Sequence, residues 1–141
     1  IHIVEMEDHV KQAGYLYKGF SGKGFVEISR SFNAKVSLTV EIPDNGLYAI
    51  DFRYSNGNGP SNTENKCAIR TLKVNNQKAG TLVFPQRGNE EWSNWGYSNP
   101  IMITLEKGDQ QISLSLEEAN ENMNIEINQA MLDYLRIRKI K

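Results

Sequence analysis

The chain of 141 residues is long enough for one domain with a hydrophobic core that needs no disulfide or metal ion to hold it together. Its 16 basic and 17 acidic residues give a net charge of -1, which excludes the extended basic surface of a typical nucleic-acid-binding protein. The single cysteine excludes an internal disulfide, and no apolar run reaches the ~20 residues of a membrane span. We therefore expect neither nucleic acid nor a membrane as a partner, and we expect the domain to be a monomer.

Alternation of apolar and polar residues with period two predicts a β-rich chain. The clearest strand patterns lie at residues 36–42, 48–54 and 112–116. Weaker patterns lie at residues 2–7, 25–29, 69–74, 79–84, 101–105 and 132–138. Asn and Gly cluster between these strands, and both residue types tolerate the positive φ of tight turns. About nine strands predict an all-β antiparallel sandwich of the jelly-roll type, with two sheets.

Two connections are longer than usual for a compact domain. Residues 55–68 and 117–130 are polar and rich in Asn. Long loops on a rigid sandwich either hold binding groups or form plain surface.

No linker or repeat divides the chain, so we expect a single domain over residues 1–141. The start IHIVEMED lacks the features of a signal peptide, so the chain is either cytoplasmic or a segment of a longer exported protein. Strand-like sequence at both ends favours an excised module.

The sequence offers little support for independent catalysis. His2 and His9 both lie at the N-terminal end, and no Gly-x-Ser-x-Gly nucleophile motif is present. The glycine-rich stretch at residues 19–25 lacks the order of a phosphate-binding loop. We therefore predict that the domain is not an enzyme.

Glu5 and Glu7 form the most informative pair of acids. If both lie on one strand, their carboxylates emerge from the same face, about 7 Å apart along it. Such a pair repels unless it is solvated or bridged by a cation. Calcium, which takes six to eight oxygen ligands, is a natural bridge where further oxygens converge. From these residues alone, a solvated strand edge and a calcium site both stay open.

The order of several short motifs resembles carbohydrate-binding module family 35 and the related family 6. The motifs, in chain order, are VEMEDHVKQAG, GFSGKGFVEI, GLYAIDFRYSNGNG, RTLKVNN, EEWSNWGYSNPIMITLEKGDQQISL and MLDYLRI. Their order and spacing cover nearly the whole chain. The resemblance implies a jelly-roll sandwich that binds polysaccharide. It also implies attachment to an exported glycan-degrading enzyme, a glycoside hydrolase or a polysaccharide lyase.

The resemblance further implies a structural calcium that joins the first strand to the last. Glu5, Glu7 and Asp133 would supply carboxylate oxygens, and a turn carbonyl, that of Lys23, would supply another. Such an ion would stabilise the native state by mass action, because the unfolded chain cannot preform the site.

The sugar site that the resemblance implies lies in loops at one end of the sandwich, where aromatic rings stack on pyranose faces. The matching ring is Trp92, with Tyr15 or Tyr17 facing it. Asn56 is a candidate for hydrogen bonds to the sugar hydroxyls. Trp95 lies nearer the strand at 101–105, and we interpret it as a packing residue.

One position departs from the family pattern. Met131 stands two residues before Asp133, where the family commonly has an Asn of the sugar site. The segment 117–130 either supplies substitute polar groups or blocks the cleft. Its candidate groups are Asn120, Asn122, Asn124, Glu126 and Asn128.

The leading hypothesis is a noncatalytic carbohydrate-binding module that targets an attached enzyme to polysaccharide. We expect it to be secreted, periplasmic or on the cell surface. The alternative is a structural appendage that packs against its parent enzyme and binds no sugar.

Overall fold

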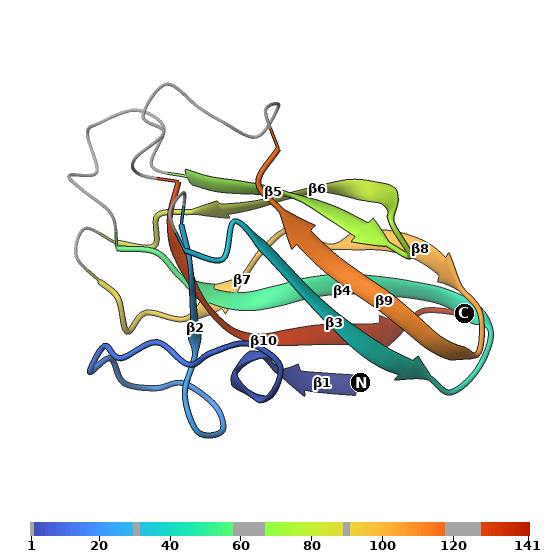
Figure 1. Ribbon diagram of the computed structural model, residues 1–141, viewed down its shortest axis with the longest axis horizontal. Coiled ribbons are helices and arrows are strands. Elements are labelled where there is room, and N and C mark those ends of the chain that lie inside the picture. The colour runs from blue at the N-terminus through green and yellow to red at the C-terminus, as the bar shows by residue number, and fades with distance from the viewer. Residues whose placement is uncertain (1, 30–31, 58–66, 89–90, 118–127) are drawn as a thin grey trace.

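The computed structural model describes residues 2–29, 32–57, 67–88, 91–117 and 128–141. Their strands form two antiparallel sheets that face each other across a single hydrophobic core (Figure 1). This arrangement confirms the predicted all-β sandwich. In the described part of the chain, no helix is both long and apolar enough to cross a membrane.

The larger sheet has six strands and is built around β10, which pairs with β1, β2 and β4. Its strands are β1 His2–Glu5, β2 Val26–Ile28, β4 Gly46–Ser55, β7 Gly96–Tyr97, β8 Ile101–Leu105 and β10 Ala130–Lys139. The smaller sheet has the strand order β3-β9-β5-β6. Its strands are β3 Lys35–Ile42, β5 Cys67–Val74, β6 Gln77–Pro85 and β9 Gly108–Ser115.

Period-two alternation explains the burial of β3. Val36, Leu38, Val40 and Ile42 are buried, and the residues between them are exposed. Successive side chains of a strand point to opposite faces, so one face of β3 enters the core and the other meets water. The predicted strand at 36–42 is therefore confirmed with the predicted face inward.

Two local features differ from the prediction. β1 ends at Glu5 rather than at residue 7, and Met6–Asp8 form a short 3-10 helix, η1. The fully buried Met6 side chain explains the turn, because it leaves the strand direction to reach the core. The two-residue strand β7 is too short to show any alternation, so the sequence predicts about nine strands where the described residues form ten.

A β-bulge interrupts the pairing of β10 with β4. Leu132 pairs with Tyr54 and Tyr134 pairs with Arg53, which leaves Asp133 as the extra residue between them. Bulges re-aim side chains that a regular ladder would direct elsewhere. Here the bulge directs the side chain of Asp133 toward the segment that precedes β2.

Candidate functional site

Three carboxylates meet where the first strand lies beside the last. Glu5 ends β1, Glu7 lies in η1 and Asp133 lies in the bulge of β10. One carboxylate oxygen from each lies within 4.8 Å of those of the other two. The strand geometry assumed for Glu5 and Glu7 is wrong, because Glu7 lies beyond the strand. The turn of η1 nevertheless brings their carboxylates together.

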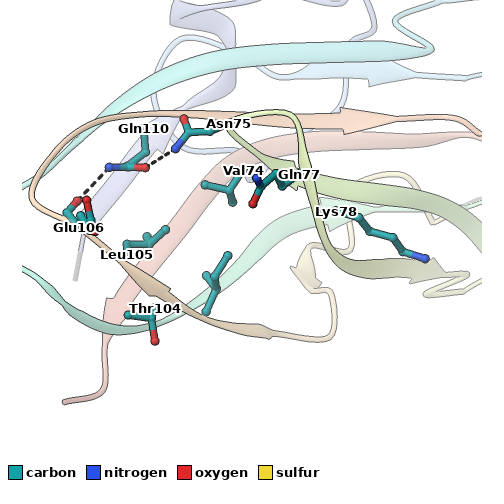
Figure 2. A pocket seen from close by; sticks show the side chains of 9 residues that line it. Val74, Asn75, Gln77, Lys78, Thr104, Leu105, Glu106 and Gln110 are labelled. Atoms are coloured by element: carbon teal, nitrogen blue, oxygen red, sulfur yellow. Dashed lines mark hydrogen bonds between the residues drawn. The ribbon is translucent and has the colours of Figure 1, made fainter.

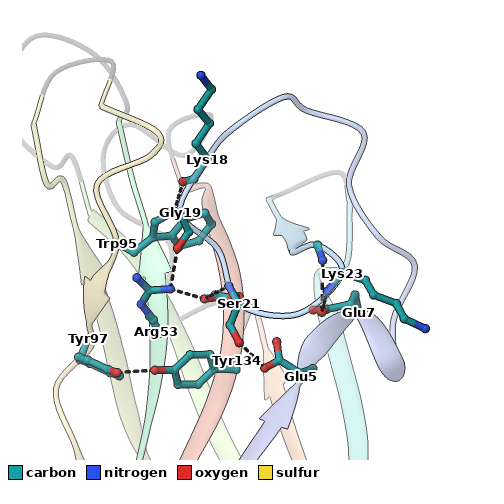
Figure 3. A network of polar contacts seen from close by, with 12 residues as sticks. Glu5, Glu7, Lys18, Gly19, Ser21, Lys23, Arg53, Trp95, Tyr97 and Tyr134 are labelled. Atoms are coloured by element: carbon teal, nitrogen blue, oxygen red, sulfur yellow. Dashed lines mark hydrogen bonds and ion pairs between the residues drawn. The ribbon is translucent and has the colours of Figure 1, made fainter.

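The turn at residues 21–24 wraps around these carboxylates (Figure 3). The Ser21 amide donates to both oxygens of Asp133 at 3.0 Å, and its hydroxyl donates to Glu5 Oε2 at 2.8 Å. The Lys23 amide donates to Glu7 Oε2 at 2.9 Å. A Cβ on Gly22 would lie 2.5 Å from Glu7 Oε2 and 2.8 Å from Glu5 Oε1, so only glycine fits this close approach.

Burial disfavours the charged forms of two of these carboxylates. Burial raises the pKa of Glu5, and the nearby Glu7 and Asp133 charges raise it further. Burial also raises the pKa of Asp133, although hydrogen bonds from Ser21 and Arg53 oppose that shift. Both shifts mean that the charged carboxylates are poorly solvated by the protein alone.

The donor set fits a hard cation such as calcium. Glu5 Oε1 and Glu7 Oε1 are buried and have no hydrogen-bond partner among the residues that the structure describes. Such buried acceptors are rare in native proteins unless water or an ion satisfies them. With Asp133 they give three carboxylates in reach of one another, and hard oxygen donors are what calcium prefers.

Lys23 contributes to this site through its backbone. Its backbone N–H donates a hydrogen bond to Glu7 Oε2. Its side chain leads away from the carboxylates (Figure 3). The Lys23 carbonyl as a calcium ligand stays a prediction.

Arg53 connects the carboxylates to the aromatic residues beside them, and the sequence analysis missed it. Its guanidinium forms an ion pair with Asp133 at 2.5 Å and donates to the carbonyl of Gly19 at 3.1 Å. The same guanidinium lies 5.7 Å from the ring centroid of Trp95 and 5.9 Å from that of Tyr134, within cation–π range. The arginine falls inside the quoted GLYAIDFRYSNGNG motif, which is the one signal that could have indicated it.

Three predicted sugar-binding rings form a cluster, which we call the aromatic stack. The Tyr17 ring stacks on both of the others, with centroid distances of 5.2 Å to Tyr15 and 5.7 Å to Trp92 and interplanar angles of 8° and 10°. It also stacks on the buried Phe25 at 5.6 Å. These centroid distances are those of rings in direct offset contact. The structure therefore brings the three rings together, but Tyr17 and Trp92 touch each other rather than facing each other across a gap.

Trp95 has the geometry of a packing residue. Its ring lies 5.5 Å from that of the buried Phe25, and its indole N–H donates to the carbonyl of Lys18 at 2.6 Å. A Cβ on Gly19 would come within 3.3 Å of the indole. The indole thus fastens the segment before β2 to the larger sheet, in line with its interpretation from sequence.

The predicted amides are structural where they are described. Asn56 is fully buried, and its side chain donates to the carbonyl of Phe84 at 2.8 Å. It has no exposed surface for a sugar and instead ties the end of β4 to β6. Asn128 is also buried and accepts from the guanidinium of Arg70. The other four candidates of the segment 117–130 lie outside the described residues.

Comparisons with known proteins find relatives over part of the chain. No family model matches the chain. A cycloisomaltooligosaccharide glucanotransferase of Niallia circulans is 36% identical over 98 residues, which are 70% of this chain and 9% of that enzyme. Mannan endo-1,4-beta-mannosidase B of a Piromyces species is 33% identical over 96 residues, which are 68% of this chain and 15% of that enzyme. The chain thus spans only a small part of the curated relatives it matches.

Solved structures identify the fold. A family 35 carbohydrate-binding module from Clostridium thermocellum has a TM-score of 0.71 at 20% identity, over 99% of this chain and 98% of that one. The chain has the fold of a family 35 carbohydrate-binding module. The resemblance read from the ordered motifs is therefore confirmed at the level of the fold.

Met131, the position that departs from the expected Asn, is part of the core of the larger sheet. Its side chain is fully buried, and it pairs with Glu27 of β2 and Ser55 of β4. A buried thioether is at most a weak hydrogen-bond acceptor, so Met131 cannot replace the hydrogen bonds of an amide.

A cavity lies at the end of the sandwich away from the aromatic stack, and it is lined by different kinds of residues. It has a volume of about 380 Å³ and lies between the turn after β5 and the end of β8 (Figure 2). Val74 and Leu105 give it an apolar floor. Two of its amides are engaged within the protein: Asn75 donates to Gln110 at 2.6 Å, and Gln110 donates to the Glu106 carbonyl at 3.0 Å. None of its described lining residues is aromatic, so it lacks the ring expected of a sugar platform.

Proposed function

We propose that the chain is a noncatalytic carbohydrate-binding domain of a larger, exported enzyme, which it holds close to polysaccharide. The domain acts as a monomer. A tethered binding site raises the local concentration of its target, so even weak binding increases contact between the enzyme and its substrate.

The aromatic stack carries this proposal. Tyr15 is 45% exposed, and Trp92 is half-buried. Because Tyr17 contacts both neighbours, a sugar would stack on the outward faces of Tyr15 and Trp92 rather than between the rings. Large, rigid rings with polar tips suit the apolar face and hydroxyl rim of a pyranose.

Calcium bound by Glu5, Glu7 and Asp133 would brace this surface. When bound, the ion would add positive charge beside Glu5 and Glu7, since, of these three described carboxylates, Arg53 pairs only with Asp133. The turn at 21–24 and the rings of Tyr15 and Tyr17 belong to one continuous segment before β2. Fixing the turn therefore also limits the motion of the rings.

Isothermal titration calorimetry tests the binding function. The ligands are isomalto-, manno-, xylo- and pectic oligosaccharides, since two relatives are named as a glucanotransferase and a mannanase. We expect one ligand class to bind and Trp92→Ala to weaken it about tenfold or more, which is about 1.4 kcal/mol. The control is Met102→Ala, at an exposed apolar residue of β8. Binding that Trp92→Ala leaves unchanged would remove the stack as the platform.

A second function, a structural appendage, is favoured by one observation. Tyr17 lies in contact with Trp92, and Met131 is buried, so no preformed slot for a sugar exists between these rings. In that case Trp92 would pack against the parent enzyme, as tryptophans often do at interfaces. Tryptophan fluorescence of the isolated domain would then stay constant across the same oligosaccharides.

A further inference from the structure

A second cavity lies beside the aromatic stack, on the edge of the larger sheet. Its volume is about 220 Å³, and it is bounded by residues 11–13, Glu27 of β2 and the pair Phe32 and Asn33. The Ala13 amide donates to the carbonyl of Phe25, the residue directly before β2, at 2.8 Å, which fixes one wall. The Asn33 side chain donates to the carbonyl of Glu27, within β2, at 2.8 Å, which fixes the other. Both walls are therefore held by the backbone at and just before β2.

The Glu27 carboxylate is oriented by Gln129, whose amide donates to its Oε2 at 2.6 Å. The Tyr15 hydroxyl lies close enough to the same carboxylate for the charge of Glu27 to raise the pKa of that hydroxyl. A carboxylate offers about four acceptor positions, so Glu27 keeps capacity for ligand hydroxyls. Tyr15 also joins the cavity to the aromatic stack, where its ring contacts Tyr17.

Phe32 supplies the apolar wall of the cavity. Its side chain is 63% exposed, although its backbone is held by Ser29, which exchanges hydrogen bonds of 2.8 and 2.9 Å with it. An aromatic ring held in water beside fixed polar groups is the arrangement that binds the apolar face of a sugar. Asn33 and Gln12 place side-chain amides on the same cavity, where they can meet hydroxyls.

We propose that this cavity is a subsite for one neutral hexose unit, with its ring on Phe32 and its hydroxyls on Glu27. The inference rests on the proposed carbohydrate-binding function. It assigns the hydrogen bonds to the sugar hydroxyls to Glu27 of β2, because the buried Met131 cannot make them. The volume falls below the ~300 Å³ typical of pockets for drug-sized ligands, which suits a single sugar ring. The fixed carboxylate of Glu27 repels a uronate. Lys11 also lines the cavity, but it is an exposed residue, so water and salt screen the attraction of its amine for a uronate.

Calorimetric titration of four proteins with isomaltoheptaose and mannohexaose tests the subsite. The proteins are the unaltered domain, Phe32→Ala, Glu27→Gln and the control Leu16→Ala. Leu16 is 95% exposed next to Tyr15 but does not line the cavity. We expect Phe32→Ala and Glu27→Gln each to weaken binding of the preferred ligand about tenfold. Leu16→Ala should leave it unchanged, and the melting temperature of Phe32→Ala should stay that of the unaltered domain because the ring is exposed.

The outcomes separate the subsite from the general function. If the domain binds and Trp92→Ala loses affinity while Phe32→Ala and Glu27→Gln keep it, the subsite is overturned and the binding function stands. If no oligosaccharide binds to the unaltered domain, the proposed function fails and the subsite fails with it. Tighter binding of an oligosaccharide ending in glucuronic acid than of its neutral counterpart would overturn the neutral class.

Discussion

The Ser21 amide donates to both carboxylate oxygens of Asp133 at 3.0 Å, although the two residues are 112 positions apart in the sequence. This contact fastens the segment before β2 to the last strand. The same segment carries Tyr15 and Tyr17 of the aromatic stack. The carboxylate cluster and the candidate sugar-binding surface therefore share one mechanical support, and disturbing the first should affect the second.

Removing calcium should destabilise the domain. A ligand present at a hundred times its Kd stabilises the native state by about 2.7 kcal/mol. For a domain of this size that corresponds to several degrees of melting temperature. Differential scanning calorimetry with calcium and with chelator measures the difference. Asp133→Ala should abolish it, whereas Glu41→Gln, at an exposed acid of β3, should preserve it. Equal melting temperatures with calcium and chelator would contradict the metal site.

Gly22→Ala should disrupt the carboxylate cluster from the backbone side. Gly22 has a φ of 61°, a left-handed conformation that costs an L-residue about 1–2 kcal/mol, and the added Cβ would also collide with Glu7 and Glu5. Gly14→Ala is the matched control, because nothing lies within 4 Å of a Cβ there. Thermal unfolding should show a loss of about 2 kcal/mol for Gly22→Ala and a change within about 0.5 kcal/mol for Gly14→Ala. The calcium response should disappear only in the first variant, and a full response there would contradict the proposed cradle.

The metal-free domain should lose stability as the pH rises from about 4 toward neutrality. The pKa values of Glu5 and Asp133 are raised in the folded state, so the folded state binds protons more tightly than the unfolded chain does. Their stabilising contribution is complete below the ordinary carboxylate pKa and is lost as the pH passes through the raised values. Calcium binds the deprotonated carboxylates and should offset this loss. The test is to measure the melting temperature from pH 4 to 7, once with chelator and once with calcium, and to compare how steeply it changes with pH. Equal pH dependence in the two conditions would count against the cluster as the calcium site.

The parts of this structure that follow from local sequence were predictable. The alternation of residues 36–42 predicted β3 and its buried face, and the ordered motifs indicated Glu5, Glu7 and Asp133. The bulge at Asp133 was not predictable, because it depends on the register between strands that are distant in the sequence. The contact of Tyr17 with Trp92 likewise depends on how two loops meet, and no local pattern encodes that.

Asn56→Ala should lower stability and leave sugar affinity unchanged. The variant removes the hydrogen bond from the Asn56 side chain to the Phe84 carbonyl and leaves a buried acceptor without that donor. Losing such a bond costs about 1–3 kcal/mol of unfolding free energy. Urea unfolding measures the loss, and titration with the preferred oligosaccharide measures affinity. A large loss of affinity in a variant that remains folded would return Asn56 to the binding surface.

Trp95→Phe and Trp92→Phe should separate the two indoles by role. Trp95 donates its indole N–H to the Lys18 carbonyl at 2.6 Å, so Trp95→Phe loses one hydrogen bond and about 1 kcal/mol of stability. Its contact with Phe25 survives in part, because phenylalanine retains a ring at that position. Trp92→Phe keeps a ring against Tyr17 but presents a smaller platform to a sugar, so it should reduce affinity more than stability. The unfolding free energy and the oligosaccharide affinity are measured for both variants. The two roles would be reversed if Trp95→Phe lost most of the affinity while the stability of that variant stayed unchanged.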